Sequence, residues 1–155
     1  MDVSQLELVE SFLDHLKLER RLSPHTVKSY RRDLDCLAEF CIQQSIAAWH
    51  ELRAHHLRHF AASSYASGLS PRSIQRRLSG TRSFLRYLIR EGRLQHNPAV
   101  DVSAPRLPKR LPATLDAEQM ARLLDIKGDK LVDWRDRAML ELLYSSGLRL
   151  AELVR

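Results

Sequence analysis

The prolines of this 155-residue chain divide it into regions that must fold differently. Pro24 and Pro71 each follow a serine. A serine before a proline is typical of a helix start, because serine caps free backbone amides and proline fits the first helical position. The other four prolines fall within residues 98–112, where such crowding favours an extended backbone. The chain is therefore predicted to be two helical regions joined by a linker over residues 98–113.

Apolar residues recur at helical spacing before the linker, and no stretch there shows the alternation typical of a strand. We expect four helices, over about residues 5–20, 24–44, 54–66 and 71–91, and an all-α fold. The inward faces of the first two are predicted to comprise Leu6, Val9, Phe12, Leu13 and Leu16, and Val27, Tyr30, Leu34, Leu37, Ala38 and Cys41.

Three further helices are predicted after the linker. Asp116 is expected to cap a short helix that ends near Asp125, a second helix should run over about residues 133–146, and a third begins near Arg149. About forty residues is marginal for an independent hydrophobic core. We therefore expect a complete domain over residues 1–97, and the first part of a larger, truncated domain over residues 114–155.

Several classes of protein and site are disfavoured. No apolar run is long enough to cross a membrane, and the polar start does not resemble a signal peptide, so a cytoplasmic protein is expected. Cys36 and Cys41 have the wrong spacing for a zinc knuckle, and two buried thiols are predicted. His55 and His59 have the spacing of a metal pair, but no third ligand follows, so no metal site is expected.

Positive charge is concentrated in residues 71–110. Ten arginines and lysines there oppose only Glu91 and Asp101, a surplus of eight, whereas the whole chain carries +6. A basic block in an otherwise near-neutral protein favours a polyanionic partner. At about 100° per residue, arginines and small hydroxyls of the fourth helix fall opposite its apolar face: Arg72, Arg76, Ser79, Ser83, Arg86 and Arg90.

This basic row contains no acid before Glu91. A row of one charge sign repels itself unless an external anion neutralises it. Because an α-helix fits the major groove of DNA, the row is predicted to bind duplex DNA rather than a membrane. The start of the second helix is expected to add His25, Lys28, Ser29 and Arg32. The alternatives are a solvated basic helix with no partner and a helical bundle that binds protein.

Residues 147–152 form a second candidate site. A glycine at position 147 permits the left-handed backbone that ends a helix, and Arg149 then stands at a new helix start, where side chains and amides can bind phosphate. Glu152 lies on the same helical face and could hold the guanidinium in place.

Taken together, these motifs resemble the Xer family of tyrosine recombinases, and its XerC branch most closely. The resemblance covers essentially the whole chain. It is specific as a combination, although each motif alone is modest. The stretches that carry it are residues 22–26, 77–88, 97–99, 102–112, 135–141 and 144–153.

This resemblance implies a SAM-like core-binding domain of four helices, a linker that crosses the DNA, and the opening of a catalytic domain. In the family, a tyrosine attacks the scissile phosphate to give a 3′-phosphotyrosyl enzyme, and strands exchange through a Holliday junction. The implied role is chromosome dimer resolution before cell division, with a XerD-like partner recombinase in a heterotetramer. No cofactor and no small-molecule substrate are implied.

The resemblance also assigns two residues. Arg149 matches the first catalytic arginine of the family, which binds the scissile phosphate, and Glu152 matches its supporting acid. Ala151 stands where the family often has serine. The remaining catalytic residues, including the tyrosine nucleophile, would follow residue 155, so this chain is expected to bind DNA without cutting it. The alternative is a helical DNA-binding regulator with no strand-transfer chemistry, which would have no use for residues 147–152.

Overall fold

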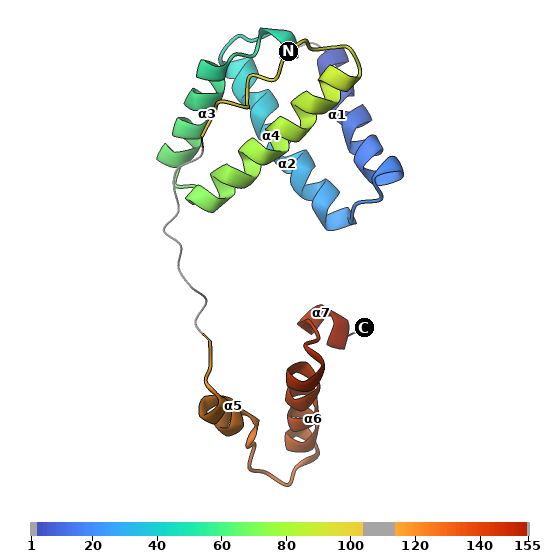
Figure 1. Ribbon diagram of the computed structural model, residues 1–155, viewed down its shortest axis with the longest axis vertical. Coiled ribbons are helices and arrows are strands. Elements are labelled where there is room, and N and C mark those ends of the chain that lie inside the picture. The colour runs from blue at the N-terminus through green and yellow to red at the C-terminus, as the bar shows by residue number, and fades with distance from the viewer. Residues whose placement is uncertain (1–2, 104–113, 155) are drawn as a thin grey trace. The chain divides into compact units, whose positions relative to one another are not determined.

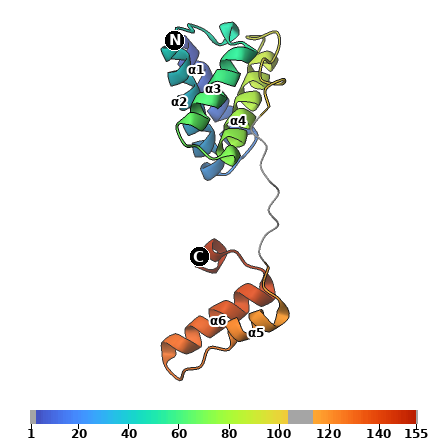
Figure 2. The ribbon, with the colours of Figure 1, turned by 90° about the vertical axis from the view of Figure 1, so that its left-hand side faces the viewer.

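The computed structural model describes residues 3–103 and 114–154. These residues form helices and no strand, and they belong to two units, one before and one after the proline-rich stretch (Figure 1, Figure 2). The predicted all-α fold is confirmed.

The first unit contains the four predicted helices, with ends close to those expected. The main difference is at the end of the first helix, which was expected to be regular to about residue 20. It instead widens into a π-helical turn after Asp14. The elements are α1 (Val3–Asp14), η1 (His15–Glu19), α2 (Pro24–Gln43), η2 (Trp49–Glu51), α3 (Ala54–Ala66) and α4 (Pro71–Arg90).

The two serine–proline pairs begin helices as predicted. The Ser23 hydroxyl accepts a hydrogen bond from the backbone N–H of Thr26 at 3.2 Å. The Ser70 hydroxyl accepts one from the backbone N–H of Ser73, also at 3.2 Å. These caps fix the first turns of α2 and α4, and the candidate site lies along the N-terminal halves of these two helices.

Helix α4 lies at the centre of the first unit and contacts α1, α2 and α3 (Figure 1). Its buried face includes Phe84, whose ring meets Trp49 edge-on with centroids 5.0 Å apart and lies 5.4 Å from Phe12. Burial of large apolar side chains such as these supplies about 1.5–3 kcal/mol each. The core therefore holds α4 with one face inward and leaves its other face available.

One predicted core residue is wrong. Leu6 is 42% exposed, whereas Val9, Phe12, Leu13 and Leu16 are buried as expected. The residue before Leu6, Gln5, instead joins the start of α1 to Trp49. The backbone N–H of Trp49 donates to Gln5 Oε1 at 3.1 Å, and the Trp49 indole N–H donates to the Gln5 carbonyl at 2.8 Å.

The beginning of the expected linker is packed into the first unit. Ala99 and Val102 are buried, and Arg82 donates to both of their carbonyl oxygens, at 2.9 and 2.5 Å. Asn97 in turn donates to the Arg82 carbonyl at 3.1 Å. The rest of the predicted linker, residues 104–113, lies outside the described residues.

The second unit contains α5 (Ala117–Leu124), α6 (Leu131–Ser146) and α7 (Leu150–Leu153). Asp116 caps α5 as predicted, accepting from the Gln119 N–H at 2.8 Å. Gly147 ends α6 with φ of +63°, the left-handed conformation that glycine tolerates. No residue within 114–154 is fully buried, and Trp134 is 63% exposed. This unit therefore has no closed apolar core of its own.

Candidate nucleic-acid interface

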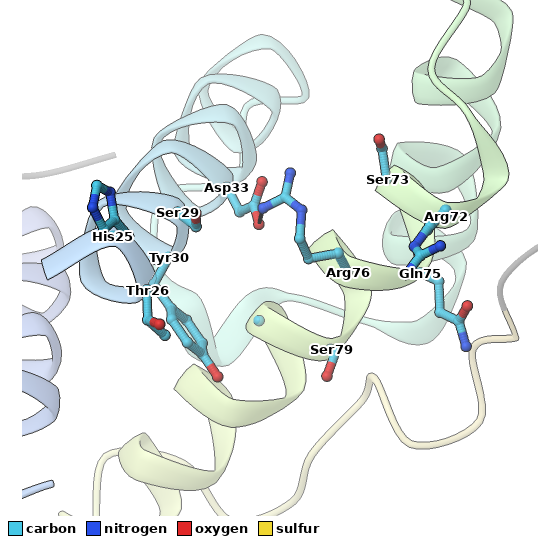
Figure 3. Close-up of a pocket in the computed structure, with 11 residues that line it drawn as sticks. His25, Thr26, Ser29, Tyr30, Asp33, Arg72, Ser73, Gln75, Arg76 and Ser79 are labelled. Carbon is cyan, nitrogen blue, oxygen red and sulfur yellow. Dashed lines mark hydrogen bonds and ion pairs between the residues drawn. The ribbon is translucent and has the colours of Figure 1, made fainter. Parts of the chain in front are cut away.

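A groove of about 790 Å³ runs between the N-terminal halves of α2 and α4 (Figure 3). Most of its lining is basic or carries a hydroxyl or amide group. Both helices begin beside it, and a helix N-terminus carries partial positive charge. The groove is thus suited to an anionic ligand. Its lining residues are His25, Thr26, Ser29, Tyr30, Asp33, Arg72, Ser73, Gln75, Arg76, Ser79 and Gly80.

The structure brings together part of each predicted patch. His25 and Ser29 of α2 face the same groove as Arg72, Arg76 and Ser79 of α4. Because the two patches belong to one groove, a single ligand could contact both helices.

The other predicted residues surround this groove or lie farther along α4. Lys28 and Arg32 are exposed on α2 but do not line it. Arg86 is exposed on α4, and Ser83 is half-buried. Arg90, at the far end, donates to Glu91 at 3.0 Å and lies 3.3 Å from both nitrogens of the His15 ring.

The expectation of a row without matching acids is wrong at Arg76, whereas Arg90 pairs with Glu91, the acid at which the row was expected to end. The carboxylate of Asp33, only 3% exposed, accepts a hydrogen bond from Arg76 Nη1. Figure 3 shows the Arg76 side chain reaching from α4 toward Asp33 on α2. Arg90 is matched by Glu91. In contrast, Arg72 and Arg86 form no ion pair with any residue in the described ranges.

Asp33 also faces a second arginine, deeper in the fold. Arg77 Nε lies 3.7 Å from Asp33 Oδ1, too far for a hydrogen bond, and neither atom has a hydrogen-bond partner in the described part of the chain. Arg77 is fixed from behind by contacts with Ser64 at 3.3 Å and with the Cys36 sulfur at 3.4 Å. Burial raises the pKa of Asp33, and the charges of Arg76 and Arg77 oppose that rise.

Gly80 has a packing role as well as lying on the groove. It is buried against Tyr30, and a Cβ added to it would lie 3.6 Å from the ring. In the fold, Gly80 is where α4 and α2 pack closely.

Asp33 lines the groove and pairs with Arg76, and it is absent from the residues predicted for this site. A signal was present, because Asp33 follows Tyr30 by three positions and precedes Leu34, which places it at the edge of the apolar face of α2. An acid on an inward face is normally paired when buried. The identity of its partners, 43 and 44 residues later, was not readable from that pattern.

The second predicted site has the expected local geometry. Arg149 precedes α7, and its backbone N–H donates to Glu152 Oε2 at 2.8 Å. Its guanidinium donates to Glu152 Oε1 at 3.2 Å, and the Arg149 side chain is 85% exposed. The acid therefore contacts both the backbone and the side chain of the arginine while most of that side chain stays exposed.

Comparisons with known proteins identify the family to which the helices of the first unit belong. The family model described as "Phage integrase, N-terminal SAM-like domain" matches residues 9–92, more than half of the chain and nearly all of α1 through α4.

Within the described residues, no helix is both long enough and apolar enough to traverse a lipid bilayer.

Among curated proteins, the chain is similar to three tyrosine recombinases named XerC. It is 49% identical to that of Azotobacter vinelandii and 47% identical to that of Pseudomonas syringae pv. syringae, each over 147 residues that cover 94% of this chain and 49% of the relative. It is 45% identical to that of Xanthomonas campestris pv. campestris over 148 residues, 96% of this chain and 46% of the relative. The chain spans about half the length of these relatives. From the groove, the helical fold and these matches together, we conclude that the chain belongs to the phage integrase family of N-terminal SAM-like domains and is similar to tyrosine recombinases of the XerC type.

Proposed function

We propose that the first unit binds duplex DNA through the groove between α2 and α4 and through the adjoining exposed face of α4. The observation that carries this proposal is that one groove gathers basic and hydroxyl side chains from the starts of two helices. Side chains of this kind bind phosphates and base edges. The relatives named tyrosine recombinase XerC support the same conclusion.

The chain would serve in site-specific recombination, in which DNA strands are cut and rejoined through a 3′-phosphotyrosyl intermediate. Its cellular role would be chromosome dimer resolution, with a XerD-like recombinase as partner. In this reaction Arg149 would bind non-bridging oxygens of the scissile phosphate and stabilise the charge that develops there. Glu152 would orient Arg149, consistent with its 3.2 Å contact to the guanidinium.

The 155-residue chain itself is proposed to bind DNA without cutting it. An arginine stabilises charge on a phosphate but supplies neither a nucleophile nor a general acid of suitable pKa. Incubation with a nicked duplex that traps covalent recombinase–DNA adducts is expected to give no adduct resistant to denaturant. Appearance of such an adduct would contradict this part of the proposal.

DNA binding is tested by fluorescence anisotropy with a labelled 30-base-pair duplex at increasing salt. If about five phosphates are neutralised, the logarithm of the association constant falls with the logarithm of salt concentration at a slope of about −4.5. A flat salt response would exclude the basic surface as the DNA-binding site.

Charge reversals locate the surface. Arg72→Glu and Arg86→Glu are expected to weaken binding and to make the salt slope less negative by about 1 to 2 each, because each removes a cation and adds a repulsive charge. Arg58→Glu is the matched control, since Arg58 is also exposed but lies on α3, outside the groove. Equal weakening by all three would indicate only a general charge effect and would reject this surface.

A further inference from the structure

We infer that Arg76, held in place by the buried carboxylate of Asp33, reads the edge of a guanine base in the DNA major groove. Asp33 is then a positioning residue for sequence recognition. This inference rests on the proposed DNA-binding function. It adds that Arg76 contacts a base, whereas Arg72 and Arg86 attract the DNA backbone.

The geometry of Arg76 differs from that of its neighbours. Its guanidinium is tied to a carboxylate that is 3% exposed, while its own side chain remains 42% exposed and lines the groove. A guanidinium has five N–H donors, and Asp33 occupies Nη1. Donors therefore remain for a ligand, on a planar group whose orientation is already fixed.

The charge balance argues against a simple phosphate-binding role. Because Asp33 offsets part of the charge of Arg76 and of Arg77, Arg76 adds less to the long-range attraction of a polyanion than an unpaired arginine does. A mobile, unpaired cation would serve that purpose better, and Arg72 and Arg86 have no ion pair with any described residue. The pair does provide a guanidinium whose planar set of N–H donors, here called the fork, is already oriented. A group that is oriented before binding loses less entropy when the ligand binds.

The fork matches a specific ligand chemistry. Guanine presents two acceptors, O6 and N7, side by side in the major groove, and a bidentate arginine is the most common specific contact to it. Phosphate contacts orient a protein on the duplex, whereas base contacts select the sequence. In this inference the guanidinium of Arg76, fixed by Asp33 and with N–H donors left for a ligand, makes a contact of the second kind.

A second arginine lies on the side of Asp33 that faces the protein interior, and this contact holds the carboxylate in position to orient Arg76. Arg77 lies 3.7 Å from its other oxygen and is anchored to Ser64 and Cys36. The close packing of Gly80 on Tyr30 sets the separation of the two helices that the pair spans. The position of the Asp33 carboxylate is thus fixed by residues of α2, α3 and α4, whereas an ordinary surface ion pair involves only its two partners.

The test uses the 155-residue chain and a library of 30-base-pair duplexes with a randomised central region. Repeated selection by the wild-type protein is expected to enrich sequences with a guanine at one or more positions. Arg76→Lys keeps the positive charge but lacks the fork, so it is expected to lose the enrichment at one guanine, with discrimination at that base pair falling about 5- to 150-fold. Its salt slope should stay within one unit of wild type.

Arg58→Lys is the matched control, because it makes the same chemical change at an exposed arginine of α3 that does not line the groove. It is expected to leave the selected sequence unchanged. Retention of every guanine preference by Arg76→Lys would overturn the assignment of Arg76, as would an identical loss in Arg58→Lys.

Asp33→Asn tests the positioning role. The selected guanine should be lost in this variant as it is in Arg76→Lys, and circular dichroism should show the same helix content as wild type. A folded Asp33→Asn variant that still selects the guanine would overturn the role of Asp33. If Asp33→Asn does not fold, Arg76→Lys alone decides the inference.

Failure of this inference is distinct from failure of the proposed function. Wild-type protein that binds the library in a salt-dependent manner without any base preference would refute the reading of guanine and leave DNA binding intact. Wild-type protein that binds no duplex at all would refute both.

Discussion

The buried carboxylate of Asp33 on α2 accepts a hydrogen bond from the guanidinium of Arg76 on α4, 43 residues later in the sequence. The pair ties together the two helices that line the candidate DNA groove. Arg76 is therefore not simply one more exposed charge on α4, because its guanidinium is hydrogen-bonded to a buried carboxylate.

The first prediction concerns stability. Arg76→Ala is expected to lower the free energy of unfolding by about 1.5–3 kcal/mol, because it leaves a buried carboxylate without its hydrogen-bond donor. Arg86→Ala is expected to change it by less than about 0.5 kcal/mol, as is usual for an exposed side chain without such a partner. Urea denaturation followed by circular dichroism measures both. Equal losses in the two variants would contradict the anchoring of Arg76.

The second prediction concerns the segment that follows α4. Arg82 donates to the carbonyls of Ala99 and Val102, and these bonds hold residues 97–102 against the helix. Arg82→Ala is expected to accelerate amide hydrogen exchange within residues 97–102 by at least about tenfold, since hydrogen bonds to a charged donor contribute about 1.5–3 kcal/mol. Mass spectrometry of peptic fragments resolves this segment from α2, which should exchange as before.

Arg93→Ala is the control for this experiment, because Arg93 is exposed in the same region and its side chain makes no hydrogen bond or ion pair among the described residues; its backbone N–H bond to the Leu88 carbonyl is kept in the variant. Faster exchange in Arg93→Ala as well would indicate that the segment is held by something other than Arg82.

The third prediction concerns pH. Arg31 on α2 donates through both terminal nitrogens to the carboxylate of Glu10 on α1, with Nη2 at 2.6 Å from Oε2. This hydrogen bonding lowers the pKa of Glu10, against a smaller opposing effect of burial. A carboxyl with a lowered pKa in the folded state stabilises the fold above its unfolded pKa and loses that contribution as pH falls through the folded value.

Glu10→Gln is therefore expected to be less stable than wild type by about 0.2–1 kcal/mol at pH 7, the usual range for an exposed ion pair. The difference should shrink as pH falls below about 4 and should also shrink at high salt. Urea unfolding at several pH values measures it. Glu7→Gln, also exposed on α1 but without an ion pair to any described residue, serves as control. A stability gap that grows on acidification would contradict the assignment.

The fourth prediction concerns the thiols, only one of which is fully buried as expected. Cys41 is inaccessible, and burial raises its pKa to about 12. Cys36 is half-buried. Because the thiolate is the reactive form, iodoacetamide at pH 8 is expected to modify Cys36 in the native protein and both cysteines in denaturant. Intact-mass spectrometry counts the adducts, and Cys36→Ser should leave the native protein unmodified. Rapid native labelling of Cys41 would contradict its burial.

Much of the fold could be predicted from local patterns. Helix starts at Pro24, Pro71 and Asp116 follow from capping chemistry that acts within four residues. The apolar faces of α2 and α4 follow from helical periodicity, which is also a local property. The turn at Gly147 and the approach of Glu152 to Arg149 involve residues five positions apart at most. The sequence could also identify the family, because its motifs lie in contiguous stretches.

Only the tertiary structure decided which polar groups meet across the helices. The same periodicity that placed Arg76 on an exposed face cannot report an acid 43 residues earlier, because their contact depends on how α2 packs on α4 at Tyr30 and Gly80. Leu6 is exposed although helical periodicity placed it inward, and the hydrogen bonds of Gln5 to Trp49, 44 residues later, attach the start of α1 to the fold. Local chemistry therefore determined the helices and the charges they carry. Packing between distant segments determined which of those charges are paired, and so which of them remain available to a ligand.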